Sequence, residues 1–402
     1  MKFKEDGIGV SDLLKLIPED LLMDLAIETK ANYQVKKLYA QNVFNLLLYG
    51  LIKGEKVGLR SLEDFYNSKK FKTLFRMPGT TKSAKYNSLS VRLATMNVAY
   101  FEKAYEAIYK QCSLLYDESI LSTKYKITRV DSTMVCETAA KLEQGINVGS
   151  KKDGKKQVKY TINMTNLFPS SVEVFTQQTC ISENKTIPRA IFKVMDKSKD
   201  NVFVFDRGVT KRDVFCELDE NNCSFITRLH VDARHIVLQD NPLPEKRTIR
   251  NLTVLKDQQV HLFKSGTEVV EHPFRLIQTQ NEKGGRFWFL TNEFELSCEE
   301  IIQAYKHRWD IEVFFRFIKQ ELNFSHLISV NANGIKILVY MTMILAMLIL
   351  VYKKVNGFGY KTAKRRFAME LEDIIDDYMI IRAGGNPNID LQESENPNTV
   401  FR

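Results

Sequence analysis

The pattern of hydrophobic and polar positions changes along the 402-residue chain. Up to about residue 120, apolar residues recur at helical spacing, for example at Leu13 and Leu16 and again from Val43 to Leu51. Between about residues 124 and 292, short runs of β-branched and aromatic residues are typical of strands. The pattern therefore predicts a helical N-terminal part followed by a strand-rich part.

The first half of the strand-rich part predicts an α/β sheet. Three consecutive strands are expected, and helices and strands then alternate. The expected elements are strands at 126–135, 158–164 and 172–177, a helix at 184–196, a strand ending at Asp206, a helix at 211–218 and a strand at 224–229. This order favours a mixed sheet covered by helices.

Residues 231–292 are richer in strand patterns than in helical ones. Residues 274–279 and 286–291 are expected to pair as a hairpin across Gly284-Gly285, because a Gly-Gly pair between two such runs favours a tight turn. This part therefore predicts a β-rich insertion before the next long helix.

The apolar run from Ile337 to Tyr352 raises the question of a membrane span. It has 16 residues, whereas a spanning helix needs about 20. We therefore expect a central helix buried beneath the mixed sheet and no membrane partner. A membrane anchor is the alternative, and cell fractionation distinguishes the two.

Residues 305–319 contain no Gly or Pro and are predicted to form one helix. At about 100° per residue, four polar side chains share an arc about 60° wide: Tyr305, Arg308, Glu312 and Lys319. Apolar residues such as Ile311 form a neighbouring face that can anchor the helix. A carboxylate held between cations suits a metal ion surrounded by phosphates. The alternative is a surface helix whose charges merely pair at helical spacing.

Two further acids lie within or at the end of apolar runs. Asp131 lies inside the run 127–135, and Asp206 follows the run 202–205. An unpaired carboxylate in a buried strand is costly, so such an acid is usually retained for a purpose. For Asp206 a turn role before Arg-Gly is an equally open interpretation.

These residues carry a resemblance to a known family. Tyr305-x2-Arg308-x3-Glu312-x6-Lys319, with Asp131-Ser-Thr and Phe-Asp206-Arg-Gly upstream, resembles the bacterial DDE transposases of the IS-four type. The resemblance covers roughly residues 120–350. It implies an RNase H-like core and cut-and-paste transposition of an insertion sequence.

The resemblance also implies how the site would work. Two Mg²⁺ ions, which Mn²⁺ can replace, would be held by Asp131, Asp206 and Glu312, with Asp131 bridging both. Tyr305, Arg308 and Lys319 would contact DNA phosphates beside the cut. No covalent enzyme intermediate is expected.

Other residues are candidates for DNA contacts. A basic turn that follows the Asp131 strand could contact phosphates, as could residues in a predicted N-terminal helix and beside Asp206: Lys151, Lys152, Lys155, Lys156, Arg92 and Arg207. For the basic turn and the helix, ordinary solvated surface is the alternative. Some members of the family stack an aromatic residue of the β-rich insertion on a flipped base. We expect Trp288 in this role, pointing outward while Phe287 and Phe289 face a core. Phe287 is one alternative, and an ordinary core aromatic of the hairpin is the other.

Charge and cysteine usage narrow the class of protein. The net charge of +9 and the pI of about 9.0 favour polyanionic partners. The six cysteines contain no Cys-x2-Cys pair, so neither a zinc site nor a disulfide framework is indicated, and His230 and His235 are expected to be ordinary surface residues. The N-terminus lacks the pattern of a signal peptide. We therefore expect a protein of the bacterial cytoplasm, associated with the nucleoid.

The expected organisation has an RNase H-like α/β core interrupted by a β-rich insertion and preceded by a helical domain. The expected parts are a DNA-binding domain at 1–120, core parts at 121–230 and 293–356, the insertion at 231–292, and one short helix with a frayed tail at 357–402. The function expected is that of a transposase acting on terminal inverted repeats, as a homodimer when bound to DNA. A host nuclease with the same fold and an inactive DNA-binding descendant of a transposase are the alternatives.

Overall fold

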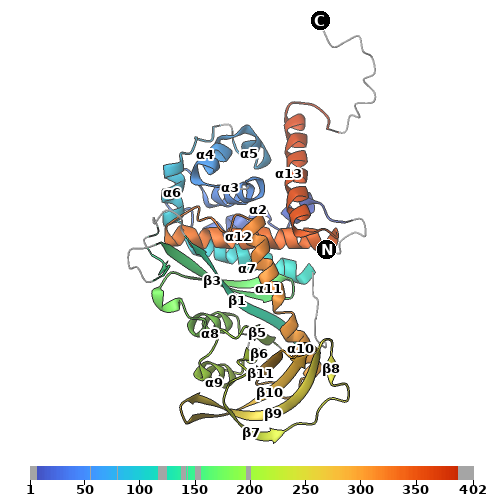
Figure 1. Cartoon of the computed structure of the whole chain (residues 1–402). Helices are drawn as coiled ribbons and strands as arrows, with labels where there is room; N and C mark the ends of the chain where they lie inside the picture. Colours follow the sequence, from blue (N-terminus) through green and yellow to red (C-terminus); the bar gives the residue numbers. More distant parts are fainter. Residues whose placement is uncertain are drawn as a thin grey trace.

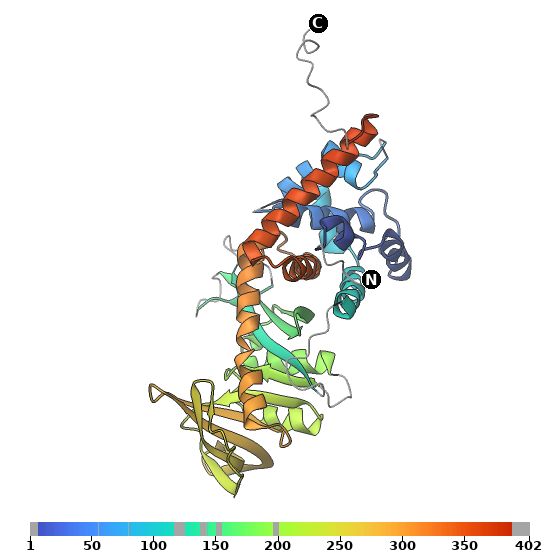
Figure 2. The same cartoon turned by 90° about the vertical axis from the view of Figure 1, so that its right-hand side faces the viewer.

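The computed structural model describes residues 7–54, 56–78, 80–115, 125–136, 142, 144–149, 155–195 and 201–387. In this part of the chain, N-terminal helices lie on one side of the long helix α12 (Ala332–Val355), and a large mixed sheet lies on the other side (Figure 1). Helix α13 (Tyr360–Arg382) runs along the N-terminal helices, as the turned view shows (Figure 2).

The N-terminal part is helical, as predicted. Its helices are α1 (Val10–Leu14), α2 (Glu19–Glu28), α3 (Ala40–Lys53), α4 (Leu59–Asn67), α5 (Lys69–Leu74), α6 (Tyr86–Thr95) and α7 (Val98–Leu115). Local sequence accounts for several of their ends. Pro18 precedes the first residue of α2, and the Ser68 hydroxyl accepts a hydrogen bond of 3.2 Å from the Phe71 amide at the start of α5.

The first half of the sheet has the strand order that was expected. Its elements are β1 (Lys126–Cys136), β2 (Ile146–Asn147), β3 (Lys156–Thr165), β4 (Phe168–Phe175), the short 3-10 helix at Gln178–Cys180, α8 (Glu183–Val194), β5 (Asn201–Phe205), α9 (Arg212–Glu220) and β6 (Ser224–Leu229). The strands β4, β3 and β1 pair antiparallel, whereas β1, β5 and β6 pair parallel. The order β4-β3-β1-β5-β6 is that of an RNase H-like sheet, so the predicted fold class is confirmed.

The second half consists of β7 (His235–Asp240), β8 (Thr248–Ile249), β9 (Leu252–Ser265), β10 (Glu268–Asn281) and β11 (Arg286–Thr291). The predicted hairpin is present, because β10 and β11 pair antiparallel, and Gly284 in the turn has a φ of +81°. Strand β11 also pairs with β6, so the β-rich part continues the same sheet across residue 231. The domain boundary at 231 stays a prediction.

The β-rich part is joined to the helices that follow by a buried ion pair. Arg275 on β10 and Asp257 on β9 lie 2.6 Å apart, and both side chains are almost fully buried. Arg275 also donates to the carbonyl oxygen of Leu296, just before α10 (Cys298–Lys306). This contact fixes the start of the helical segment that carries Tyr305.

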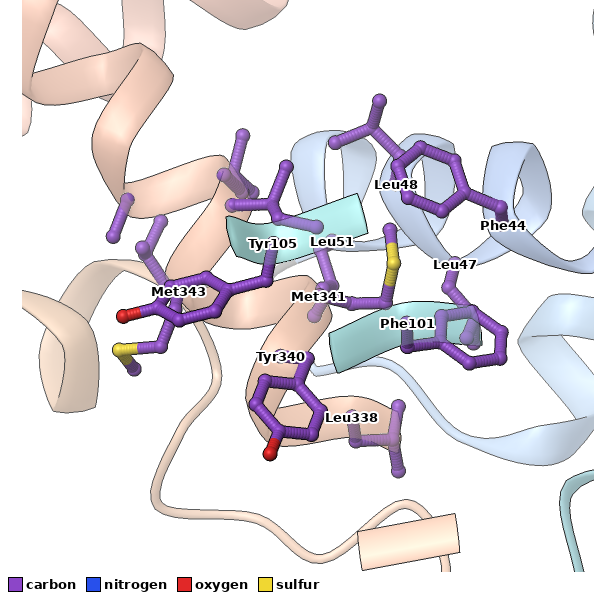
Figure 3. Packing of buried hydrophobic residues seen from close by; sticks show 14 of the residues in the cluster. Phe44, Leu47, Leu48, Leu51, Phe101, Tyr105, Leu338, Tyr340, Met341 and Met343 are labelled. Atoms are coloured by element: carbon purple, nitrogen blue, oxygen red, sulfur yellow. The ribbon is translucent and has the colours of Figure 1, made fainter. Parts of the chain in front are cut away.

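Helix α12 forms the centre of the molecule. It is apolar on all sides, and every residue from Ile337 to Tyr352 is buried. Its residues, including Tyr340 and Met341, pack against α3 and α7 on one side (Figure 3), and β4 lies against it as well. The prediction of a buried core helix is therefore confirmed.

The C-terminal part differs from the prediction of one short helix. Helix α13 has 23 residues, because apolar residues at intervals of four, Ala363, Phe367, Leu371 and Ile375, extend the contact with the core over several turns. Residues 388–402, where a frayed tail was expected, lie outside the described residues.

Candidate active site

Asp131 and Asp206 lie side by side at neighbouring strands. In the parallel register of β1 and β5, Val130 is opposite Phe205, so the next residues of the two strands are the two acids. Hydrophobic residues surround the strands at this point, with Val130 and Phe205 fully buried. The fold thus places two carboxylates together at the carboxyl end of β5, where α/β sheets commonly bind ligands.

Burial, together with the neighbouring charges of Asp206 and Glu183, raises the pKa of Asp131 to about 7. Two groups act in the opposite direction: the Ser132 amide, which donates to Asp131 Oδ1 over 2.7 Å, and the Arg308 guanidinium. The balance shows a carboxylate whose negative charge is not fully compensated by the protein.

Asp206 also has a turn role. Its Oδ1 accepts a hydrogen bond of 2.9 Å from the Gly208 amide, and its own carbonyl oxygen accepts from the Thr227 hydroxyl. A Cβ at position 208 would lie 2.9 Å from Asp206 Oδ1 and 3.0 Å from Cγ of Glu183. A side chain at position 208 would therefore crowd both acidic side chains.

The segment expected as one helix is two helices. Helix α10 ends at Lys306 and α11 (Trp309–Glu321) begins at Trp309, with His307 and Arg308 between them. The backbone tightens here, because the amides of Arg308 and Asp310 bond to carbonyls three residues earlier rather than four. No Gly or Pro marks this break. The carbonyl of His307 instead accepts a hydrogen bond from a side chain on β1, that of Arg129.

Arg308 lies between two of the predicted catalytic acids. One guanidinium nitrogen is 2.5 Å from Glu312 Oε1, and another is 3.6 Å from Asp131 Oδ2. Its Nε is buried and has no hydrogen-bond partner in the described part of the chain. Arg308 was predicted to contact DNA, and here it links a strand carboxylate to a helix carboxylate.

The donors suit a hard divalent cation, since Asp131, Asp206 and Glu312 offer carboxylate oxygens. Among the described residues, however, no group of three His, Cys, Asp or Glu side chains is close enough to hold a metal ion. Asp131 and Glu312 contact Arg308 instead. The three acids thus belong to one region without forming a closed carboxylate cluster.

The family model for the transposase DDE domain matches residues 122–348, more than half of the chain. The chain belongs to the DDE transposase domain family. This is a family of catalytic transposases, and the match spans the strands and helices that carry Asp131, Asp206 and Glu312.

Several bacterial transposases are similar to this DDE-family chain. A putative transposase of Sinorhizobium fredii is 25% identical over 154 residues, which are 38% of this chain and 43% of that protein. A putative transposase for insertion sequence element IS4SA of Synechocystis is 26% identical over 295 residues, which are 67% of this chain and 76% of that protein. The chain thus spans less than half of the first relative and about three quarters of the second.

A solved structure of a piggyBac transposase synaptic complex with hairpin DNA is also similar. The comparison has a TM-score of 0.48 and 10% identity, and it covers 93% of this chain and 82% of that chain.

Tyr305 and Lys319 of this transposase-family chain flank the acids. Tyr305 is at the end of α10, its pKa is raised by burial, and its ring lies 5.8 Å from the Arg308 guanidinium and 5.3 Å from the Phe289 ring. Lys319 Nζ is 3.4 Å from the carbonyl oxygen of Met134 on β1, and burial lowers its pKa. Both therefore face the sheet, Tyr305 beside Arg308 and Lys319 beside Met134.

The aromatic residues of β11 do not have the predicted orientation. Trp288 is half-buried, packs against the cluster that includes Val260 and Leu262, and contacts the His235 ring at 5.3 Å. Phe287 lies on the opposite face, where the Arg228 guanidinium is 4.7 Å from its ring centre. The alternation of faces along β11 was correct. The expectation that Trp288 points outward was wrong, because its side chain packs against this cluster and the His235 ring.

The Arg92 guanidinium forms hydrogen bonds within the helical N-terminal part. Its Nε donates to the Leu38 carbonyl over 3.0 Å, and Nη2 donates to the Ala31 carbonyl over 2.6 Å. Burial lowers its pKa. Arg92 was predicted to contact DNA, whereas here its side chain turns inward and links the segment before α3 with α6.

The remaining basic candidates are surface residues. Arg207 and Lys155 are exposed, and Lys156 is partly buried at the start of β3. Lys151 and Lys152 lie outside the described residues.

Sequence reasoning missed Glu183 and Arg228. Glu183 accepts from the Ser132 hydroxyl over 2.9 Å and pairs at 2.9 Å with Lys159, whose side chain is fully buried. Arg228 on β6 has a buried Nε without a hydrogen-bond partner among the described residues. The only signal in the sequence was a charged residue at a helix start and another in a strand, and neither is specific.

Proposed function

We propose that this chain is a DNA transposase that binds the ends of an insertion sequence, cuts the DNA strands there and joins them to a target. Membership of the DDE transposase domain family supports this proposal. The observation that carries it is that Asp131 and Asp206 lie side by side on neighbouring strands, and that Asp131 contacts Arg308, which pairs with Glu312. Carboxylates next to fixed cations suit phosphodiester cleavage.

We propose Mg²⁺, with Mn²⁺ as a substitute, as the cofactor. The family generally uses divalent metal ions, and two ions would be held by Asp131, Asp206 and Glu312. Such ions acidify the attacking water or 3′-hydroxyl and neutralise charge on the phosphate. The oxygen donors fit this role, as does the burial that makes the charge of Asp131 costly without a cation.

The side chains around the acids have roles of their own. With a pKa of about 7, the Asp131 carboxyl is partly protonated near neutral pH and loses that proton before it can act as a metal ligand. Arg308 compensates the charges of Asp131 and Glu312, and its planar fork can also hold a phosphate oxygen. Tyr305 on α10 and Lys319 on α11 would contact the DNA backbone.

The proposed partner is double-stranded DNA, both the ends of the element and the target. The net charge of +9 and exposed cations such as Arg207 and Lys155 support an electrostatic contribution to that binding. Two ends are joined in one event, so we propose a homodimer on DNA. Because the relatives are bacterial and α12 is buried in the core, we propose a cytoplasmic protein associated with the nucleoid.

The test uses purified protein with the DNA that flanks its own gene. With Mg²⁺, cleavage is expected at the ends of the element, and it is expected to stop in EDTA. Asp131→Ala, Asp206→Ala and Glu312→Ala are each expected to abolish cleavage while the affinity for the end DNA changes little. A variant that still cuts at close to the normal rate removes its residue from the proposed metal site.

The same experiment distinguishes the alternatives. Binding without any cutting by the wild-type protein would indicate an inactive DNA-binding descendant. Cutting without preference for the element's ends would indicate a nuclease of the same fold.

A further inference from the structure

Arg129 lies two residues before Asp131 on β1, so both side chains point to the same face of the sheet. Only 1% of Arg129 is exposed. Burying a guanidinium is costly unless its N–H groups find partners. The hydrogen-bond partners of the Arg129 guanidinium therefore indicate the role of this residue.

The guanidinium joins three segments. Its Nε donates to the His307 carbonyl over 2.9 Å, Nη1 donates to the Asn166 carbonyl over 2.7 Å, and Nη2 lies 3.3 Å from Asp310 Oδ2. Asn166 is in the turn between β3 and β4, and His307 and Asp310 surround the junction of α10 and α11. One side chain thus fixes this junction to the strand that carries Asp131.

The contact coincides with the helix break. In a continuous α-helix the Ile311 amide would bond to the His307 carbonyl, four residues earlier. Here the Ile311 amide bonds to the Arg308 carbonyl over 3.3 Å, and the His307 carbonyl accepts from Arg129 and from the Asp310 amide. Arg308 and Glu312 follow directly, so their direction toward Asp131 depends on where the break is held.

We infer that Arg129 is a positioning residue for the proposed active site. It fixes the position of the α10–α11 junction along β1. This places an Arg308 guanidinium nitrogen 3.6 Å from an Asp131 carboxylate oxygen and keeps Glu312 paired with Arg308. Arg129 itself contacts neither DNA nor metal in this scheme. The effect of Arg129 on DNA cleavage rests on the proposed function, whereas its effect on the position of the α10–α11 junction does not.

The test compares Arg129→Met, Arg129→Lys and Asp310→Asn with Arg92→Met. Arg92 is a matched control, because its guanidinium also donates to two backbone carbonyls, but inside the helical domain. The first measurement is the Mg²⁺ concentration that gives half-maximal cleavage of end DNA. For Arg129→Met we expect it to rise about 10- to 100-fold, as is typical when a group that orients metal ligands is lost. The DNA affinity of Arg129→Met should stay as in the wild type, and so should the Mg²⁺ requirement of Arg92→Met.

Arg129→Lys is expected to give partial rescue, since one ammonium group cannot reach the three acceptors in the geometry of a guanidinium fork. A purely structural role would lower the thermal stability of all the arginine variants without changing the Mg²⁺ requirement.

The second measurement needs no catalysis. The chain has two tryptophans, and Trp309 is the first residue of α11, directly after the junction. In a Trp288→Phe background, the fluorescence anisotropy decay of Trp309 reports local motion on the nanosecond scale. Arg129→Met should enlarge its fast component, and Arg92→Met should not.

The outcomes are distinct. A folded Arg129→Met variant with the wild-type Mg²⁺ requirement and the wild-type Trp309 decay overturns the inference. If Arg129→Met does not fold, the test rests on Asp310→Asn, which is expected to fold because the Asp310 side chain is 48% exposed. If Asp310→Asn then leaves both the Mg²⁺ requirement and the Trp309 decay unchanged, the inference is overturned. If the wild type itself cuts no DNA, the proposed function fails, while the Trp309 decay still tests the role of Arg129 at the junction.

Discussion

Replacing Asp131 by Asn should change how the stability of the protein depends on pH. Burial raises the pKa of this carboxyl from the ordinary 3.8 to about 7. The folded protein therefore holds a proton that the unfolded chain releases near pH 4. The stabilisation from that proton is fully present below about pH 4 and is lost as the pH rises through about 7.

The size of the effect follows from the pKa difference of about three. At about 1.4 kcal/mol for each pKa unit, wild-type stability should fall by about 4 kcal/mol across this pH range relative to Asp131→Asn. The Asn side chain does not ionise, so the variant should be the more stable protein at pH 8 and should lose its advantage toward pH 4.

The assay is thermal unfolding in EDTA between pH 4 and 8.5, recorded as the difference in Tm between variant and wild type. EDTA is needed because a bound cation would favour the ionised carboxylate. Asp232→Asn is a suitable control, since that acid is 83% exposed on its side chain and lies far from the site along the chain. A difference for Asp131→Asn that stays constant over the whole pH range would mean that Asp131 does not hold an extra proton in the folded protein.

Three further predictions concern neighbouring groups. Gly208→Ala should lower the rate of cleavage at least tenfold with little change in DNA affinity, because the new Cβ would lie 2.9 Å from a carboxylate oxygen of Asp206. Gly58→Ala is the control, since nothing lies within 4 Å of a Cβ there. Equal cleavage rates for the two variants would contradict the prediction. Lys319→Ala should reduce the slope of log affinity against log salt by about one, and an unchanged slope would mean that this lysine contacts only protein. Phe287→Ala should impair end processing more than first-strand nicking, because loss of base stacking costs about 1 to 3 kcal/mol, whereas Trp288→Ala should mainly lower the Tm; the reverse pattern would restore Trp288 as the stacking residue.

The acids of the site could be predicted because their sequence surroundings are unusual. Asp131 interrupts a run of residues that fold into the central strand β1, and Asp206 ends the run that forms β5. Apolar runs locate strands well, and a carboxylate within one is rarely neutral in its effect. The strand order followed from the same runs, since three strands without intervening helices must pair as a meander before the crossovers begin.

Other features depend on contacts between distant segments. The break between α10 and α11 has no Gly or Pro, and it coincides with a hydrogen bond from Arg129, 178 residues earlier. Arg92 turns inward to donate to the carbonyls of Leu38 and Ala31, which lie 54 and 61 residues away along the chain. For Trp288 the alternation along β11 fixed only that it opposes Phe287, and which of the two packs against Val260, Leu262 and His235 became known from the structure. Local patterns contain none of this information.

The central position of α12 has a consequence for the synthesis of the chain. Helix α3 ends at Lys53, but the helix that covers its apolar face ends at Val355. At about 5 to 20 residues per second, a ribosome needs on the order of 15 to 60 s to make the residues between them. During that time the N-terminal helices have no partner for this face. Chains released before residue 332 should therefore be captured by chaperones or proteases and should not accumulate as a folded N-terminal fragment.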